Sequence, residues 1–85
     1  MLSWLYIGPM KAKHEIRSHL KRHRLMADGM TQQELADRVK VTRQTILSIE
    51  KGKYTPSVAL ALRLARVFDV PVEALFELEE GQHHE

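Results

Sequence analysis

Arg43, Gln44, Thr45 and Ser48 lie close together in the chain, and their side chains have the chemistry needed to read DNA bases. Arginine donates two hydrogen bonds to guanine, glutamine pairs in a similar way with adenine, and threonine offers a methyl group to thymine. An ordinary solvated helix surface more often carries pairs of Glu and Lys. This grouping therefore indicates a helix whose outer surface contacts base edges in the major groove.

The stretch just before this group predicts a first helix that holds the base-reading helix in place. Thr31 and Glu34 have the spacing of a capping box, in which each side chain bonds the backbone amide of the other residue. Apolar residues then recur at helical spacing, which predicts a helix over about 32–39. These apolar residues are Leu35, Ala36 and Val39.

The base-reading helix itself has recognisable ends. Thr42 is a suitable N-cap, and Gly52 tolerates the left-handed backbone that commonly ends a helix. Between them, at about 43–51, Ile46 and Ile49 are spaced to face the core. Two short helices joined by a tight turn, the second with a polar outer surface, are the pattern of a helix-turn-helix.

The charge of the chain is unevenly distributed, although the net charge is only +2. Residues 1–53 contain eleven Lys and Arg against five Asp and Glu, a balance of +6, whereas residues 54–85 contain two against six, a balance of −4. The basic half includes the base-reading helix, as a surface that binds a polyanion requires, and we expect the acidic half to face away from DNA. The chain has no cysteine, which excludes disulfides and thiolate metal sites.

Further polar residues flank the two helices. Gln32 and Gln33 suit hydrogen bonds to phosphate or base edges, but for Gln33 plain helix-surface polarity explains the residue almost as well. Lys53 and Tyr54 follow Gly52, where a chain leaving the groove crosses a phosphate. The alternative for Tyr54 is packing of its ring.

The remaining segments complete a small helical domain. Residues 11–27 predict a first helix, with Ile16, Leu20 and Ala27 near one face and basic residues over the rest. Ser57 caps a helix that extends to Phe68 and is apolar almost all round, so it is either central in the core or also contacts a partner. A last short helix is expected from Val72 to Phe76. Residues 77–85 form a loose acidic tail. In the alternative, Phe76–Leu78 pair as an edge strand in a dimer.

We therefore divide the chain into an apolar extension at 1–10, a domain at 11–77 and an acidic tail at 78–85. The apolar run before Gly8-Pro9 is too short to span a membrane and lacks the features of a signal peptide. Three interpretations of it stay open. In the first, it is a flexible extension, or a start codon was assigned too early and Met10 is the true start. In the second, it is an arm that packs across a partner subunit. In the third, it anchors the chain to a membrane surface.

Two further sets of residues concern charge and metals. Glu50 is an unusual acid to place beside DNA, so we interpret it as structural and paired with Arg22 or Arg24. Glu15, His19 and His23 have helical spacing, but no fourth ligand lies within reach in the sequence, so we predict no metal site.

The chain resembles the Cro-and-repressor-type helix-turn-helix family, also called the Xre family, over about residues 14–77. The resemblance rests on the segments MTQQELADRV, TRQTILSIEKGKYTPS and LALRLARVFDVPVEALF. It implies an all-α fold, a compact five-helix bundle of the lambda-repressor-like DNA-binding type. It also implies a homodimer on a palindromic operator, with the third helix in the major groove.

Carried over by position, the resemblance places Gln32 at phosphate or sugar. It places Thr42, Arg43, Gln44 and Ser48 at bases or the adjoining backbone, and Lys51, Lys53 and Tyr54 near the backbone.

Two positions depart from the family pattern. Lys40 stands where the family usually has glycine, so either a lysine adopts a positive φ at a cost of about 1 kcal/mol, or the turn is redrawn. Leu25 occupies the expected place of an arginine, and this leaves the partner of Glu50 open between Arg22 and Arg24.

The leading hypothesis is a cytoplasmic DNA-binding transcriptional regulator, a repressor acting as a homodimer on double-stranded DNA. The alternative is an antitoxin that also masks a toxin protein, using the apolar arm at residues 1–7 or the acidic tail. A protein-interaction module without DNA is a third class, against which the base-reading surface argues. No catalytic set, phosphate-binding glycine loop or carboxylate pair indicates an enzyme or a cofactor.

Overall fold

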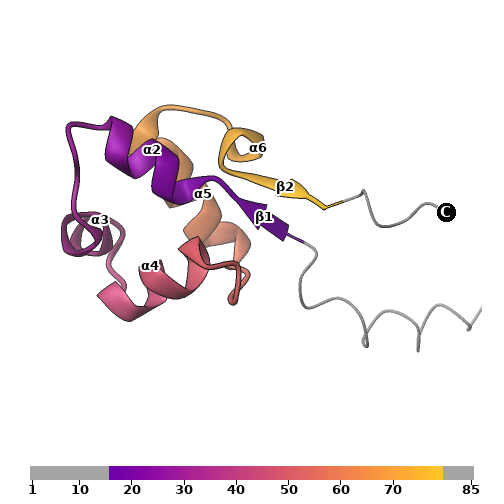
Figure 1. Cartoon of the computed structure of the whole chain (residues 1–85), viewed down its shortest axis with the longest axis horizontal. Coiled ribbons are helices and arrows are strands. Elements are labelled where there is room, and N and C mark those ends of the chain that lie inside the picture. The colour runs from indigo at the N-terminus through magenta and orange to yellow at the C-terminus, as the bar shows by residue number, and fades with distance from the viewer. Residues whose placement is uncertain (1–15, 80–85) are drawn as a thin grey trace, which may run out of the picture.

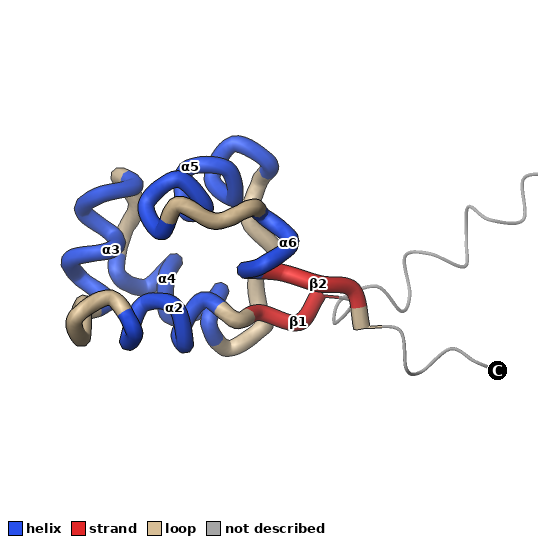
Figure 2. Tube along the Cα trace, turned by 90° about the horizontal axis from the view of Figure 1, so that it is seen from above, coloured by secondary structure: helices blue, strands red, loops and turns tan. Residues whose placement is uncertain are grey.

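The computed structural model describes residues 16–79, in which five helices and two short strands follow one another. In chain order they are β1 (Ile16–Ser18), α2 (Leu20–Met26), α3 (Gln32–Val39), α4 (Arg43–Glu50), α5 (Val58–Phe68), α6 (Val72–Leu75) and β2 (Phe76–Leu78) (Figure 1). The predicted helical bundle is confirmed, and the small sheet is a minor addition to it. In both views the sheet lies at the opposite end of the molecule from α3 (Figure 2).

Polar side chains cap three of the helices at their first turns. The capping box before α3 is complete, because Glu34 N donates to Thr31 Oγ1 at 3.0 Å and Thr31 N donates to a carboxylate oxygen of Glu34 at 2.8 Å. Thr42 Oγ1 accepts from Thr45 N at 3.2 Å, before α4. Ser57 and Leu60 make the equivalent 3.1 Å bond at α5. These bonds satisfy amides that have no partner inside the helix, so the predicted starts of α3, α4 and α5 are confirmed.

Every helix contributes to one apolar core. Its fully buried members are Leu20, Leu35, Val39, Ile46, Ile49, Leu64 and Leu75. Ile46 and Ile49 face inward as predicted, and Val41 packs against the core from the turn before α4. Since a short helix is marginal in isolation, burial of these side chains is the main support for each one.

The N-terminal part of the predicted first helix is wrong, because Ile16–Ser18 form a strand and α2 begins only at Leu20. Ile16 pairs with Leu78 and Ser18 with Phe76 in an antiparallel ladder, and the amide of His19 then donates to Leu75 O at 2.7 Å. These partners lie about sixty residues away in the sequence, so helical spacing alone did not reveal them. Residues 11–15 lie outside the described part of the chain.

The C-terminal elements differ from the prediction in a related way. The last helix ends at Leu75, one residue early, because Phe76 already belongs to β2. The alternative of a strand at Phe76–Leu78 is confirmed, and this strand pairs with β1 of the same chain; its pairing with a second subunit stays a prediction. The boundary predicted after residue 77 falls inside this strand. Residues 1–9, whose three interpretations stay open, are outside the described range.

No helix within residues 16–79 is long and apolar enough to span a membrane.

Candidate nucleic-acid interface

Helix α4 presents its N-terminal side chains to solvent while its inner face anchors it. Arg43 and Gln44 are exposed and Thr45 and Ser48 are half-buried, whereas Ile46 is fully buried in the core. The four predicted base-reading residues therefore share the accessible side of one helix. Thr45 Oγ1 lies 3.0 Å from Thr42 Oγ1, so these two hydroxyls are engaged with each other at the start of the helix.

The turn between α3 and α4 keeps the geometry for which glycine is the usual residue. Lys40 has φ 61° and ψ 46°, the left-handed conformation, and the next amide, that of Val41, donates to Ala36 O at 3.0 Å. The turn is therefore not redrawn around the lysine. The side chain is exposed, so the substitution carries only the backbone cost, about 1 kcal/mol for a non-glycine residue in this region.

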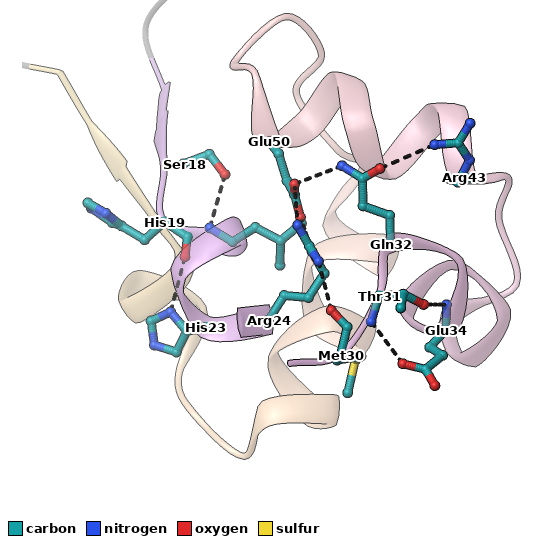
Figure 3. Close-up of polar contacts among 11 residues, drawn as sticks. Ser18, His19, His23, Arg24, Met30, Thr31, Gln32, Glu34, Arg43 and Glu50 are labelled. Atoms are coloured by element: carbon teal, nitrogen blue, oxygen red, sulfur yellow. Dashed lines mark hydrogen bonds and ion pairs between the residues drawn. The ribbon is translucent and has the colours of Figure 1, made fainter. Parts of the chain in front are cut away.

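A buried ion pair links the end of α4 to α2. Arg24 Nε donates to Glu50 Oε2 at 2.6 Å and Arg24 Nη2 donates to Oε1 at 3.1 Å, and the two side chains are only 8% and 4% exposed (Figure 3). A third bond, from Nη1 to Met30 O at 2.7 Å, ties the same guanidinium to the loop before α3. The choice left open between Arg22 and Arg24 is thus resolved in favour of Arg24.

Gln32 connects this ion pair to the base-reading side chains. Its Nε2 donates to Glu50 Oε1 at 3.1 Å, and its Oε1 accepts from Arg43 Nη1 at 3.4 Å (Figure 3). The amide group therefore stands between a buried carboxylate and the exposed guanidinium of Arg43. Sequence reasoning placed Gln32 at the DNA surface but missed this internal role, since nothing local relates Gln32 to Glu50.

Gln33 has a different setting one residue along the chain. Its Nε2 donates to Asp37 Oδ1 at 2.9 Å, across one turn of the exposed side of α3. This bond agrees with the helix-surface interpretation of Gln33, and a contact of Gln33 with phosphate or base edges stays a prediction.

The residues after α4 form the second part of the candidate interface. Lys51 is the C-cap of α4, Gly52 has φ 75°, and Lys53 N donates to Ser48 O at 2.9 Å, which folds the chain back over the helix end. Lys53 is exposed and Tyr54 is 47% exposed, so the ring of Tyr54 is not taken into the core. Two lysines and a phenol are thus held on the surface at the end of α4.

The histidines of α2 and its approach make bonds within the protein. His19 Nε2 lies 3.0 Å from Glu77 Oε2, and His23 Nδ1 lies 3.2 Å from His19 O. Within residues 16–79 no three His, Asp or Glu side chains are placed to hold a metal ion, and Glu15 is outside that range.

Comparison with known proteins adds a family and several relatives. A helix-turn-helix family model matches residues 20–75, from the first residue of α2 to the last of α6. An uncharacterized HTH-type transcriptional regulator of Archaeoglobus fulgidus is 48% identical over 67 residues, covering 79% of this chain and 93% of the relative. A similarly described regulator of Methanocaldococcus jannaschii is 42% identical over 67 residues, covering 79% of this chain and 100% of the relative. An uncharacterized HTH-type transcriptional regulator of Bacillus subtilis is 48% identical over 52 residues, covering 61% of this chain and 79% of the relative.

Proposed function

We propose a specific role for this chain within the Cro/repressor-type (Xre) family of helix-turn-helix transcriptional regulators, to which it belongs. As a member it is a DNA-binding regulator. In the proposed role it acts in the cytoplasm as a repressor, as a homodimer that binds a palindromic operator with one α4 in each of two successive major grooves. The proposal assigns the chain no catalytic activity and no cofactor.

The observation that carries the proposal is the setting of Arg43. Its guanidinium is exposed at the N-terminus of α4, yet it contacts Gln32, which is fixed by the buried pair of Glu50 and Arg24. A side chain held in this way loses less conformational entropy on binding than a free one, and this favours affinity. A guanidinium presented to a groove is suited to bidentate pairing with guanine.

The proposed contacts divide into two kinds. Arg43 and Gln44 read base edges, with Thr42, Thr45 and Ser48 at bases or the adjoining backbone. Gln32 and Gln33 stay among the predicted contacts of α3, the first at phosphate or sugar. Contacts from the end of α4 go to the DNA backbone and give affinity without sequence information; they come from Lys51, Lys53 and Tyr54.

The antitoxin alternative depends on residues 1–7 or on the acidic tail. Residues 1–15 and 80–85 lie outside the described part of the chain, so this alternative stays untested and the proposal concerns DNA.

Selection of bound sequences from a random DNA pool tests the proposal directly. The selection is run at about 150 mM salt, where the Debye length is about 8 Å and weak nonspecific attraction is screened. We expect a palindrome whose half-sites lie about ten base pairs apart, one turn of the double helix. Recovery of no motif, with binding lost as salt is raised, would contradict sequence-specific reading and leave only a basic surface.

A further inference from the structure

An open hollow of about 540 Å³ lies between the outer surface of α2 and the end of α4. Four side chains of α2 line it, together with Ser18 and His19 before that helix and Glu50, the last residue of α4 (Figure 3). None of the residues proposed to contact DNA lies in its wall. The hollow is thus a surface that the proposed function does not use.

Two apolar side chains project from α2 beside this hollow. Leu25 is 50% exposed and Met26 is 73% exposed. Side chains of this size gain free energy when they are buried, and methionine adapts its shape to many partners. Both are suited to an apolar contact that the described part of the chain does not supply.

The wall of the same hollow is cationic. Lys21 and Arg22 are exposed, and neither makes an ion pair within residues 16–79. The one carboxylate that the described residues place in this wall is that of Glu50, whose side chain is only 4% exposed and is already held by Arg24. The hollow therefore attracts anionic groups.

The cations and the apolar side chains are neighbours on the helix surface. Lys21 and Leu25 are four residues apart, as are Arg22 and Met26, and this spacing brings side chains together on one side of a helix. A partner that covers Leu25 and Met26 therefore brings its adjacent groups within reach of both cations. Carboxylates are the protein side chains that form charge-assisted hydrogen bonds with lysine and arginine.

We infer that this hollow binds an acidic amphipathic helix of another protein. Helices of this kind place apolar side chains at i, i+3 or i+4 into a partner's groove. Here those side chains cover Leu25 and Met26, and the flanking Asp and Glu residues pair with Lys21 and Arg22. Because α4 begins at Arg43 and ends at Glu50, about 10 Å of helix separates the hollow from the start of the base-reading surface. A partner bound here is thereby brought to the DNA site that α4 selects.

Two other occupants match only part of this surface. In a two-fold contact between copies of the chain the same patch meets itself, so Lys21 and Arg22 would face their own copies, and like charges repel. A DNA phosphate would satisfy the two cations and leave Leu25 and Met26 in water. An acidic amphipathic helix satisfies the cations and the apolar side chains together.

Selection from a library of displayed helical peptides, randomised on one face, tests the inference with the full chain as the target. We expect enrichment of sequences that carry apolar residues at i and i+3 or i+4 with Asp or Glu beside them. One selected peptide is then synthesised and titrated with the protein by fluorescence anisotropy. No enrichment over a selection without protein, or enrichment of peptides that lack acidic residues, would overturn the inference.

Variants of the hollow show where the selected peptide binds. Leu25→Glu should weaken its binding at least about tenfold, because an apolar contact is replaced by a charge that repels the peptide. Arg22→Glu should weaken it in the same direction. Leu62→Glu and Arg63→Glu make the same changes at exposed positions of α5 and should leave the affinity as it is. Circular dichroism checks that all four variants are folded. An affinity that is unchanged in both α2 variants places the peptide elsewhere and overturns the inference.

DNA binding separates this inference from the proposed function. Lys21→Ala and Arg22→Ala should leave both the operator affinity and its salt dependence unchanged, since neither cation is assigned to a phosphate. A slope of log affinity against log salt that falls in magnitude by about one in either variant would make the hollow a phosphate contact and overturn the inference. Failure to select a DNA motif, with peptide binding that still depends on Leu25, would contradict the proposed function and leave this inference standing.

The mass of the chain in solution identifies a second copy as the occupant. Sedimentation equilibrium of wild type and Leu25→Glu, without peptide or DNA, should give the same mass. A wild-type dimer that becomes a monomer in Leu25→Glu would assign the hollow to a second copy and overturn the inference.

Discussion

Gln32 Nε2 donates a 3.1 Å hydrogen bond to Glu50 Oε1, which joins the first residue of α3 to the last residue of α4. The opposite end of the same amide accepts from Arg43 at 3.4 Å. Because Glu50 is held by two bonds from Arg24, the position of Arg43 depends on a chain of contacts that reaches into the core. Arg43 is thus partly fixed before any DNA is present.

The contact between Gln32 and Arg43 predicts coupling between the two residues in DNA binding. In a double-mutant cycle with Gln32→Ala and Arg43→Ala, we expect the two effects on affinity to be non-additive by about 0.5–3 kcal/mol, the range for residues in contact. Binding to the selected operator is measured for all four proteins by fluorescence anisotropy. Gln33→Ala paired with Arg43→Ala is the control, because Gln33 bonds Asp37 instead, and its effect should be additive.

Arg43→Ala alone should weaken binding to the cognate site by about 1–3 kcal/mol, the value of one bidentate contact to a base. Preference should relax at one base pair of each half-site and stay intact at the others. Repeating the sequence selection with the variant measures this change. Arg63→Ala, an exposed arginine on α5, should leave the motif as it is. Unchanged cognate affinity in Arg43→Ala would mean that α4 does not dock in the way proposed.

Lys53→Ala should weaken binding to every DNA sequence to about the same extent, because a phosphate contact carries no base information. The slope of log affinity against log salt should fall in magnitude by about one for each lysine removed. Titrations at several salt concentrations, with cognate and random duplexes, give both quantities. A loss restricted to the cognate duplex would assign Lys53 to base reading instead.

Glu50→Ala should destabilise the fold by about 3–5 kcal/mol, since it leaves the guanidinium of Arg24 buried without its partner. Urea denaturation followed by circular dichroism measures the change. The matched comparison is Arg17→Ala. Arg17 is 57% exposed and pairs with Glu77 and Glu79, which are 48% and 29% exposed, so this variant removes surface ion pairs. That loss should be within about 1 kcal/mol, as for surface pairs in general. Equal losses in the two variants would contradict the structural role of Glu50.

Lys40→Gly should raise the free energy of unfolding by up to about 1 kcal/mol, because glycine adopts φ 61° without a steric penalty. The control is Lys51→Gly at φ −86°, where glycine gains nothing and its extra freedom in the unfolded chain lowers stability. Opposite signs for the two substitutions in thermal denaturation would support the backbone explanation.

Local sequence determined the helix-turn-helix itself. The caps at Thr31, Thr42 and Ser57 each bond the amide three residues away, and the apolar spacing of α3 and α4 is set by a single helix period. Interactions of this range leave a clear pattern in the chain, so the bounds of α3 were predicted correctly from residues alone. The residues of the base-reading surface were predicted by the same reasoning, and their contacts with DNA stay predictions.

Only the tertiary structure decided the features that depend on residues far apart. Ile16–Ser18 form a strand because Phe76–Leu78 lies beside them. Their spacing of apolar and basic residues is also compatible with the helix predicted over 11–27. Arg24 and not Arg22 reached Glu50, and Gln32 turned toward the same carboxylate, because α2, α3 and α4 pack around one core. The physical reason is that hydrogen bonds and burial depend on distance in space. The spacing of residues in the sequence predicts which side chains are close in space only within about one helical turn.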